Sequence, residues 1–309
     1  MMVVHKTVRA LVGGYINPFN SFKSKFNRNQ LFNIKYTHTS FISNTLTMAH
    51  PNRLQNARVL VFGGTSGIGY GVASMALSNG AIVTISGSAQ PKADAKAAEL
   101  QSLYPSASVR GVALDLSDTA NLEANLKALF EKVTNGGEQK LDHIVHCAGD
   151  ALFLPKIHEV SADNALQGFN VRWLTSVLIG KLLATGTYMN AATSSSFTLT
   201  GGTNTTKPME GWFIGASWGG ASEGLMRGLA VDLKPIRVNL MAPGAIDTPL
   251  FQKFVDNVGR EKEAEIKKAY TLLQTWGDVR DIAEGYGWFM RDHYVTGTIA
   301  SSDGGRLLK

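Results

Sequence analysis

The chain has very little cysteine, no long apolar run and, over its first 48 residues, no acidic residue. Cys147 is its single cysteine, and one thiol cannot form an internal disulfide, so we expect a reducing compartment. No apolar stretch approaches the roughly 20 residues that a membrane-spanning helix needs. We therefore expect a soluble, cytoplasmic protein without a membrane partner.

Residues 1–48 differ in charge from the rest of the chain. They hold six of the 30 basic residues and none of the 24 acidic ones, and they are rich in Ser, Thr, Asn and Phe. This composition is typical of a mitochondrial transit peptide, which would make the protein mitochondrial, but it also suits a disordered tail or a false start upstream of Met48. In the remainder, basic and acidic residues are equal in number, so we expect no nucleic-acid partner.

Short apolar segments alternate with helical patterns from Arg58 onward. The expected strands are Val59–Phe62, Ile82–Ile85, Val109–Leu114, His143–His146, Phe197–Thr200, Val238–Met241 and Thr298–Ser301. The expected helices are Gly69–Ser78, Ala93–Leu103, Leu122–Val133, Val171–Ala184 and Gly220–Leu233. This alternation predicts an α/β protein, a single doubly wound Rossmann domain over residues 55–309 with a seven-stranded parallel sheet.

The segment after the first expected strand is rich in glycine and opens a helix. Gly63, Gly67 and Gly69 have the spacing G-x-x-x-G-x-G. Gly63 allows a tight turn, Gly67 lets the backbone approach a pyrophosphate, and Gly69 permits close packing of the helix. Because N–H groups at the start of a helix attract anions, this context predicts a dinucleotide-phosphate site.

This glycine spacing resembles that of the short-chain dehydrogenase/reductase family, and the resemblance covers about residues 55–308. Further motifs follow in the family's order: LDL at Leu114–Leu116, HCAG at His146–Gly149, IRVNLMAPGAIDTPL at Ile236–Leu250, and VTGTIASSDGG before the C-terminus. The likeness is greatest to an atypical fungal branch of the family found in secondary-metabolite pathways, which includes NADP(H)-dependent iminium reductases.

The resemblance also implies which residues bind the cofactor. Asp115 would contact the adenine ring, and Pro243, Gly244 and Thr248 would hold the nicotinamide carboxamide. The implied set is Gly63, Thr65, Ser66, Gly67, Ile68, Gly69, Ser88, Asp115, Ala148, Gly149, Pro243, Gly244, Ile246 and Thr248.

Cofactor choice depends on the end of the second strand. It carries Gly87 and Ser88 where an acidic residue would bind the ribose hydroxyls of NAD. Ser88 could donate a hydrogen bond to a 2′-phosphate and Lys92 could add positive charge. We therefore expect NADP(H) rather than NAD(H), although Ser88 could also simply line a turn.

The proton-transfer residues of the family are missing. Ordinary members carry a Ser and a Tyr-x-x-x-Lys motif, in which the lysine lowers the pKa of the catalytic tyrosine. No Tyr-x-x-x-Lys occurs in this chain. By resemblance, Gly215 stands at the tyrosine position, Gly219 at the lysine position, and Gly201 or Gly202 at the serine position. We expect Gly215 and Gly219 to widen the pocket for a bulky substrate.

Three polar residues near the expected pocket are candidate catalytic residues. Asn170 matches the family's catalytic Asn, Arg172 follows it by two positions, and Glu210 precedes the helix that carries Gly215. Arg172 would also suit a surface or an interface, and Glu210 a solvated loop. Trp212 and Trp218 could form an aromatic wall for a cationic substrate or could pack in the core.

Other features of the chain have simpler explanations. His143 and His146 lack metal-ligand partners, so we expect roles in the core or in the cofactor loop for them and no metal site. Asp247 could cap the next helix. Residues 249–273 are expected to be mainly irregular, and their charged part, Arg260–Lys268, is either a solvated helix face or a mobile lid.

The favoured interpretation is an NADP(H)-dependent oxidoreductase that reduces an activated C=N (iminium) or C=C bond of a small-molecule substrate, bulky and cationic, in secondary metabolism. An iminium accepts hydride to give a neutral amine, so no acid is needed. Two alternatives stay open: a non-redox regulatory or scaffold protein that keeps the nucleotide site, and an alcohol/ketone oxidoreductase with an unrecognised acid. A homodimer or homotetramer is expected from the apolar helices at 171–184 and 220–233.

Overall fold

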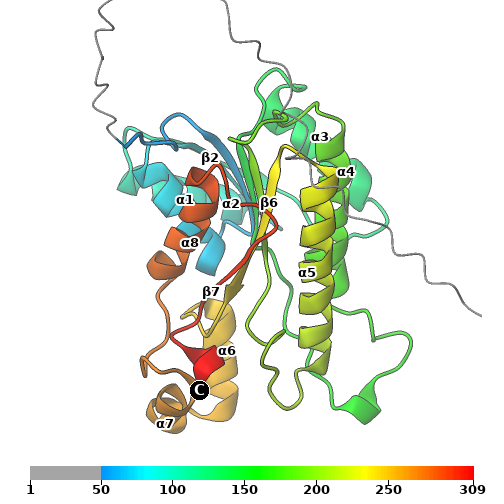
Figure 1. The fold of residues 1–309 in the computed structure, drawn as a ribbon, viewed down its shortest axis with the longest axis vertical. Coiled ribbons are helices and arrows are strands. Elements are labelled where there is room, and N and C mark those ends of the chain that lie inside the picture. Colours follow the sequence, from blue (N-terminus) through cyan, green and yellow to red (C-terminus); the bar gives the residue numbers. More distant parts are fainter. Residues whose placement is uncertain (1–49) are drawn as a thin grey trace, which may run out of the picture. The chain divides into compact units, whose positions relative to one another are not determined.

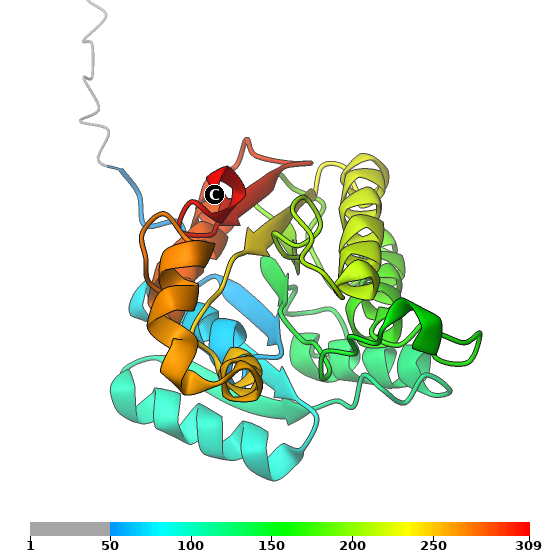
Figure 2. The same cartoon turned by 90° about the horizontal axis from the view of Figure 1, so that it is seen from below.

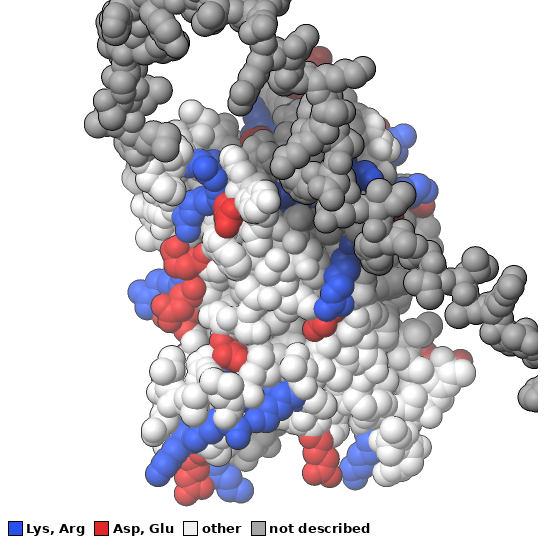
Figure 3. All heavy atoms as spheres, in the orientation of Figure 1, with Lys and Arg blue, Asp and Glu red and all other residues white. Residues whose placement is uncertain are grey.

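The computed structural model describes residues 50–309 of this chain, so the expectations for residues 1–48 fall outside the described part. Within that part, no helix is both long and apolar enough to cross a membrane. Basic and acidic side chains lie interspersed on the face drawn in Figure 3.

Seven parallel strands form one sheet in the order β3-β2-β1-β4-β5-β6-β7, which confirms the predicted fold class (Figure 1). The strands are β1 (Arg58–Phe62), β2 (Ile82–Gly87), β3 (Ser108–Ala113), β4 (His143–His146), β5 (Ser196–Thr200), β6 (Arg237–Pro243) and β7 (Ile299–Ser302). Val61 of β1 lies beside Ile85 of β2 and Val145 of β4. The chain order reverses between β1 and β4, and ligands of such sheets bind in the crevice at the carboxyl ends of these strands.

Helices cover both faces of the sheet (Figures 1 and 2). One face carries α1 (Gly67–Ser78), α2 (Gln90–Leu103) and α8 (Val279–Arg291). The other face carries α3 (Leu122–Thr134), α4 (Thr175–Ala184) and α5 (Phe213–Asp232). Helix α8 was not predicted, yet its Tyr286 and Phe289 are fully buried. Each such side chain contributes about 1.5–3 kcal/mol by leaving water.

The continuous apolar sequence of β1 serves two cores. Successive side chains of a strand point to opposite faces. Leu60 and Phe62 therefore pack with α3 and α4, whereas Val59 and Val61 pack with α1 and α8. A strand buried on both faces needs an unbroken apolar run rather than an alternating one, which explains why its hydrophobic pattern was so clear.

The expectation that residues 249–273 are mainly irregular is wrong. They form two helices, α6 (Pro249–Val258) and α7 (Glu263–Tyr270). Thr248 begins α6 by accepting a hydrogen bond from the backbone N–H of Phe251 at 3.2 Å, and Pro249 suits a first helical position. The charged part forms α7, where Lys267 pairs with Glu263 one turn away at 2.9 Å. Helix α5 also begins earlier than predicted, at Phe213 instead of Gly220.

Candidate cofactor and substrate site

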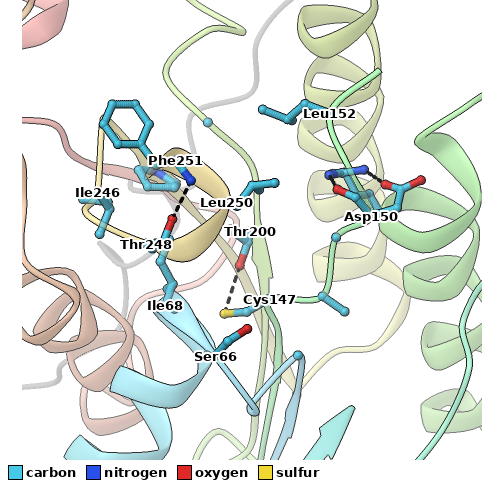
Figure 4. Close-up of a pocket in the computed structure, with 18 of the residues that line it drawn as sticks. Ser66, Ile68, Cys147, Asp150, Leu152, Thr200, Ile246, Thr248, Leu250 and Phe251 are labelled. Atoms are coloured by element: carbon cyan, nitrogen blue, oxygen red, sulfur yellow. Dashed lines mark hydrogen bonds and ion pairs between the residues drawn. The ribbon is translucent and has the colours of Figure 1, made fainter. Parts of the chain in front are cut away.

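A cavity of about 700 Å³ opens at the carboxyl ends of the central strands. Ser66 and Ile68 of the glycine-rich loop lie at one end of the view in Figure 4, and Leu152, Leu250 and Phe251 lie at the other. This volume lies within the usual range of pockets that bind small molecules or cofactors.

The structure brings all the implied cofactor-binding residues together, because each residue of that set lines this cavity. They come from five separate stretches of the chain, between Gly63 and Thr248, that meet only through the parallel sheet. Their contact with a cofactor stays a prediction.

The glycine-rich loop has a shape that only glycine allows. Gly63 has a positive φ of 75°, and a Cβ there would lie 2.6 Å from the backbone nitrogen of Ala148. A Cβ on Gly69 would collide with the carbonyl of Gly63. Ser66 precedes α1 without a side-chain capping bond, so the first N–H groups of the helix stay available to an anion.

The adenosine of the cofactor is expected at the end of the cavity near Ser88. The hydroxyl of Ser88 is a hydrogen-bond donor at the position where an acidic residue would favour NAD. Ser88 and Lys92 are exposed and line it. At Gly87 a Cβ would lie 2.6 Å from Cγ2 of Thr65, so a side chain there would displace that threonine. The hydroxyl and backbone N–H of Ser117 donate to Asp115 at 2.7 and 2.9 Å and lower the pKa of Asp115, which keeps it ionised.

Of the three candidate catalytic residues, Arg172 alone lines the main cavity. It is only 8% exposed. Its Nη1 forms an ion pair with the carboxylate of Asp150, and its Nη2 donates to the carbonyl of Asp150 at 2.7 Å (Figure 4). Its guanidinium lies 4.6 Å from the ring of Trp218. Burial lowers the pKa of Arg172 to about 10, so it remains charged at neutral pH.

Asn170 and Glu210 do not line the main cavity. Asn170 begins a π-helical turn, Asn170–Leu174, and lines a neighbouring cavity of about 350 Å³ beyond Asp150. Glu210 is exposed on the loop before α5. The geometry gives neither residue a direct contact with the larger site.

Asp150 was missed by the sequence reasoning. It lies in both cavities and its side chain is 39% exposed. It directly follows the HCAG motif after β4, at the carboxyl edge of the sheet, and an acid at that edge is a signal that could have been used.

The buried histidines have core roles, as expected. His143 Nδ1 lies 2.9 Å from the Ser196 hydroxyl, and His146 Nε2 lies 2.9 Å from the Val171 carbonyl. Burial lowers the pKa of His143 to about 3 and that of His146 to about 4, so both are neutral. Because a carbonyl can only accept, the proton of His146 resides on Nε2.

Cys147 is also unsuited to act as a nucleophile. Its Sγ accepts a hydrogen bond from Thr200 Oγ1 at 3.4 Å (Figure 4). Burial raises the pKa of the Cys147 thiol to about 11, so it stays protonated.

The far end of the cavity is apolar and aromatic. Trp212 packs edge-on against Phe254 of α6, and Phe251 packs edge-on against Trp276 with ring centres 5.0 Å apart. Further lining residues on this side are Leu152, Met209, Trp218, Leu250, Ile266 and Tyr270. Helices α6 and α7 therefore contribute to the aromatic end of the cavity, where the substrate is expected, and both Trp212 and Trp218 belong to its wall.

Comparison with known proteins identifies the family. The model of the SDR-like Rossmann domain matches residues 50–309. The chain belongs to the short-chain dehydrogenase/reductase family. It is 36% identical to the short-chain dehydrogenase/reductase malC of Malbranchea aurantiaca over 83% of this chain and 96% of that protein. It is 35% identical to ucsE of an Acremonium species, over 83% of this chain and 97% of that protein.

A solved structure supports the same assignment. The MalC reductase/Diels-Alderase from Malbranchea aurantiaca matches with a TM-score of 0.78 and 34% identity, over 84% of this chain and all of that one. The predicted resemblance to fungal short-chain dehydrogenase/reductases of secondary metabolism is confirmed. As a member of this family, the chain is expected to use a nicotinamide cofactor.

The two glycines of α5 that were matched to the family's Tyr and Lys have different surroundings. Gly215 lines the cavity, and a Cβ there would lie 3.3 Å from Cε3 of Trp212. Gly219 is outside the cavity lining, because Thr205 occupies the space in front of it. The expectation that both glycines widen this short-chain dehydrogenase/reductase pocket is thus supported for Gly215 and is wrong for Gly219.

Proposed function

We propose that this protein is an NADP(H)-dependent reductase of an activated C=N bond, an iminium ion, in secondary metabolism. The observation that carries the proposal is the wall contributed by α5 and the residue before it. It presents Trp212, Gly215 and Trp218, with no tyrosine or lysine from that helix. When bound, the reduced nicotinamide supplies a hydride, and hydride addition to an iminium carbon leaves a neutral amine. No acid is then required, unlike in the reduction of a ketone.

The charges beside this wall suit a cationic substrate. Asp150 offers a partly exposed carboxylate to the cavity, and Arg172 holds it through two contacts. The aromatic side chains that line the same cavity could also attract a cation through their ring faces. In this proposal Asp150 binds the cation and Arg172 positions Asp150.

The residues at the adenosine end support NADP(H) as the cofactor. Ser88 can donate to a 2′-phosphate, Lys92 adds positive charge, and the tight contact between Gly87 and Thr65 leaves no room for an acid at that position. The glycine-rich loop and the residues from Pro243 to Thr248 would hold the remainder of such a nucleotide.

The ketone reductase alternative now has a specific candidate acid. Tyr270 of α7 contributes the phenol in the lining of the main cavity. Burial raises its pKa, although the nearby charge of Arg306 opposes that rise. A ketone reductase that relies on this phenol should lose its activity in Tyr270→Phe.

The test of the proposal is NADPH consumption with two substrates of similar size, N-methyl-3,4-dihydroisoquinolinium and 2-tetralone. The proposal predicts turnover of the cation and little of the ketone. Asp150→Asn should lower kcat/KM for the cation by about tenfold, since it removes the negative charge while keeping an acceptor for Arg172. Asp281→Asn, the same change at an exposed site in the first turn of α8, is the control. Tight NADPH binding without hydride transfer to either compound would favour the regulatory alternative.

A further inference from the structure

One buried arginine beside the cavity has no acidic partner. Arg306, in the C-terminal 3₁₀ turn Arg306–Leu308, is only 3% exposed. None of the ion pairs among residues 50–309 includes it. Its Nε and Nη1 have no acceptor within the described residues. Buried charges are usually paired, so the bonds that Arg306 does make call for an explanation.

Arg306 contacts two elements of the cavity wall. Its guanidinium lies 4.6 Å from the ring of Tyr270 on α7. Its Nη2 donates to Oδ1 of Asn204 at 2.8 Å and to the carbonyl of Lys207 at 2.6 Å, both on the loop after β5. Tyr270 and Asn204 line the cavity, whereas Arg306 does not.

This contact determines which end of the Asn204 amide is free. A guanidinium can only donate hydrogen bonds, so the Asn204 atom that faces Arg306 must be the oxygen. The Nδ2 group, with two N–H donors, is then directed away from Arg306. It has no acceptor among the described residues.

The position of Asn204 places its two free N–H donors in the wall of the main cavity. Asn204 is the only carboxamide side chain in the lining of the main cavity, among residues 50–309. Thr203 beside it donates its backbone N–H to the carbonyl of Pro243 at 3.1 Å, next to the expected nicotinamide site. Met209 and Trp212, farther along the same loop, also line the cavity and are apolar or aromatic. A donor at an otherwise apolar wall fixes the orientation of a ligand through one acceptor atom.

We propose that Asn204, oriented by Arg306, donates a hydrogen bond to an uncharged carbonyl oxygen of the substrate. This inference rests on the proposed function, which defines the bond that is reduced. It adds that the substrate carries an amide or ketone oxygen elsewhere in the molecule. Asn204 is the recognition residue, and Arg306 is a positioning residue.

The test uses binding, so that its failure is distinct from a failure of hydride transfer. The probes are N-methyl-1,2,3,4-tetrahydroisoquinoline and its 3-carboxamide, titrated by calorimetry into the protein saturated with NADP⁺. One hydrogen bond is worth about 3- to 10-fold in affinity, so the wild type should prefer the carboxamide by that factor. Equal affinities, or binding of neither probe, would overturn the proposal.

Asn204→Asp separates recognition from folding. The carboxylate would pair with Arg306 and supply the missing counter-charge, so the melting temperature should be unchanged or higher. The variant has no N–H donors, so the preference for the carboxamide should disappear. Asn125→Asp, the same change on the exposed surface of α3, should leave both properties unchanged.

Two further measurements complete the test. Arg306→Lys keeps a donor for Asn204 Oδ1 and should retain part of the preference, whereas Arg306→Met should lose it. The affinity for NADPH should stay the same in every Asn204 variant. A weaker affinity for NADPH in Asn204→Asp would mean that Asn204 binds the cofactor, and would contradict the proposal.

Discussion

The hydroxyl of Thr205 lies where a side chain on Gly219 would begin. The loop after β5 therefore occupies the space into which a lysine at position 219 would extend. A side chain restored at position 219 would therefore have to displace the Thr205 hydroxyl.

Gly219→Ala should destabilise the protein by about 1–3 kcal/mol, because the new methyl group meets Thr205 in a packed wall. Alanine would otherwise favour a helix over glycine, so the sign of the change is informative. Thermal denaturation of Gly219→Ala, Thr205→Ala and the double variant measures the coupling. The double variant should recover most of the free energy of unfolding that Gly219→Ala loses. If Gly219→Ala alone raises the melting temperature, Thr205 does not close this space.

Gly215→Tyr should lower activity by filling the cavity. A Cβ at this position already lies 3.3 Å from Trp212, and the tyrosine ring would extend into the substrate end. KM should rise for a bulky cationic substrate while the affinity for NADPH stays unchanged. A higher rate in Gly215→Tyr with Gly219→Lys would mean that an acid had been restored to a reaction that needs one.

Ser88→Asp should shift the preference from NADPH towards NADH. The introduced carboxylate would repel a 2′-phosphate and accept bonds from ribose hydroxyls. Fluorescence titration with both cofactors measures the change, and Ser102→Asp on the exposed face of α2 controls for added charge. Equal affinity of the wild type for the two cofactors would contradict the assignment of NADP(H).

Light scattering at micromolar concentration should give the mass of a dimer or a tetramer. Gly224 and Gly228 of α5 have no neighbouring atoms within 4 Å of a Cβ, and Val231 is 64% exposed. In the family, α4 and α5 form a symmetric interface between subunits. Val231→Asp should weaken that association, and a monomeric wild type would disprove it.

The fold and the cofactor end were predictable from sequence because their signals are local. Gly63, Gly67 and Gly69 are needed for a turn and a close contact within seven residues, and the apolar run of β1 reflects burial on both faces. The order of the motifs then placed distant residues such as Thr248 at the same edge of the sheet.

Only part of the substrate end was predictable. Trp212, Gly215 and Trp218 were expected there, but the rest depends on contacts between distant segments. Phe254 and Tyr270 belong to short helices of ten and eight residues, which were not recognised as helices that line the cavity. The partner of Arg172 is Asp150, 22 positions earlier, and that of Arg306 is Asn204, 102 positions earlier. No local pattern reports such pairs.

The pH dependence of hydride transfer shows whether the reaction needs a catalytic acid. Single-turnover oxidation of NADPH by N-methyl-3,4-dihydroisoquinolinium should be followed from pH 6 to about 9, with 2-tetralone in parallel. We expect a fast rate of NADPH oxidation with the cation that changes little with pH. No phenol supplies a proton in this reaction, and Arg172 stays charged below its pKa of about 10. A fast reaction with the ketone, or a rate for the cation that falls with the titration of a catalytic acid in this range, would contradict it.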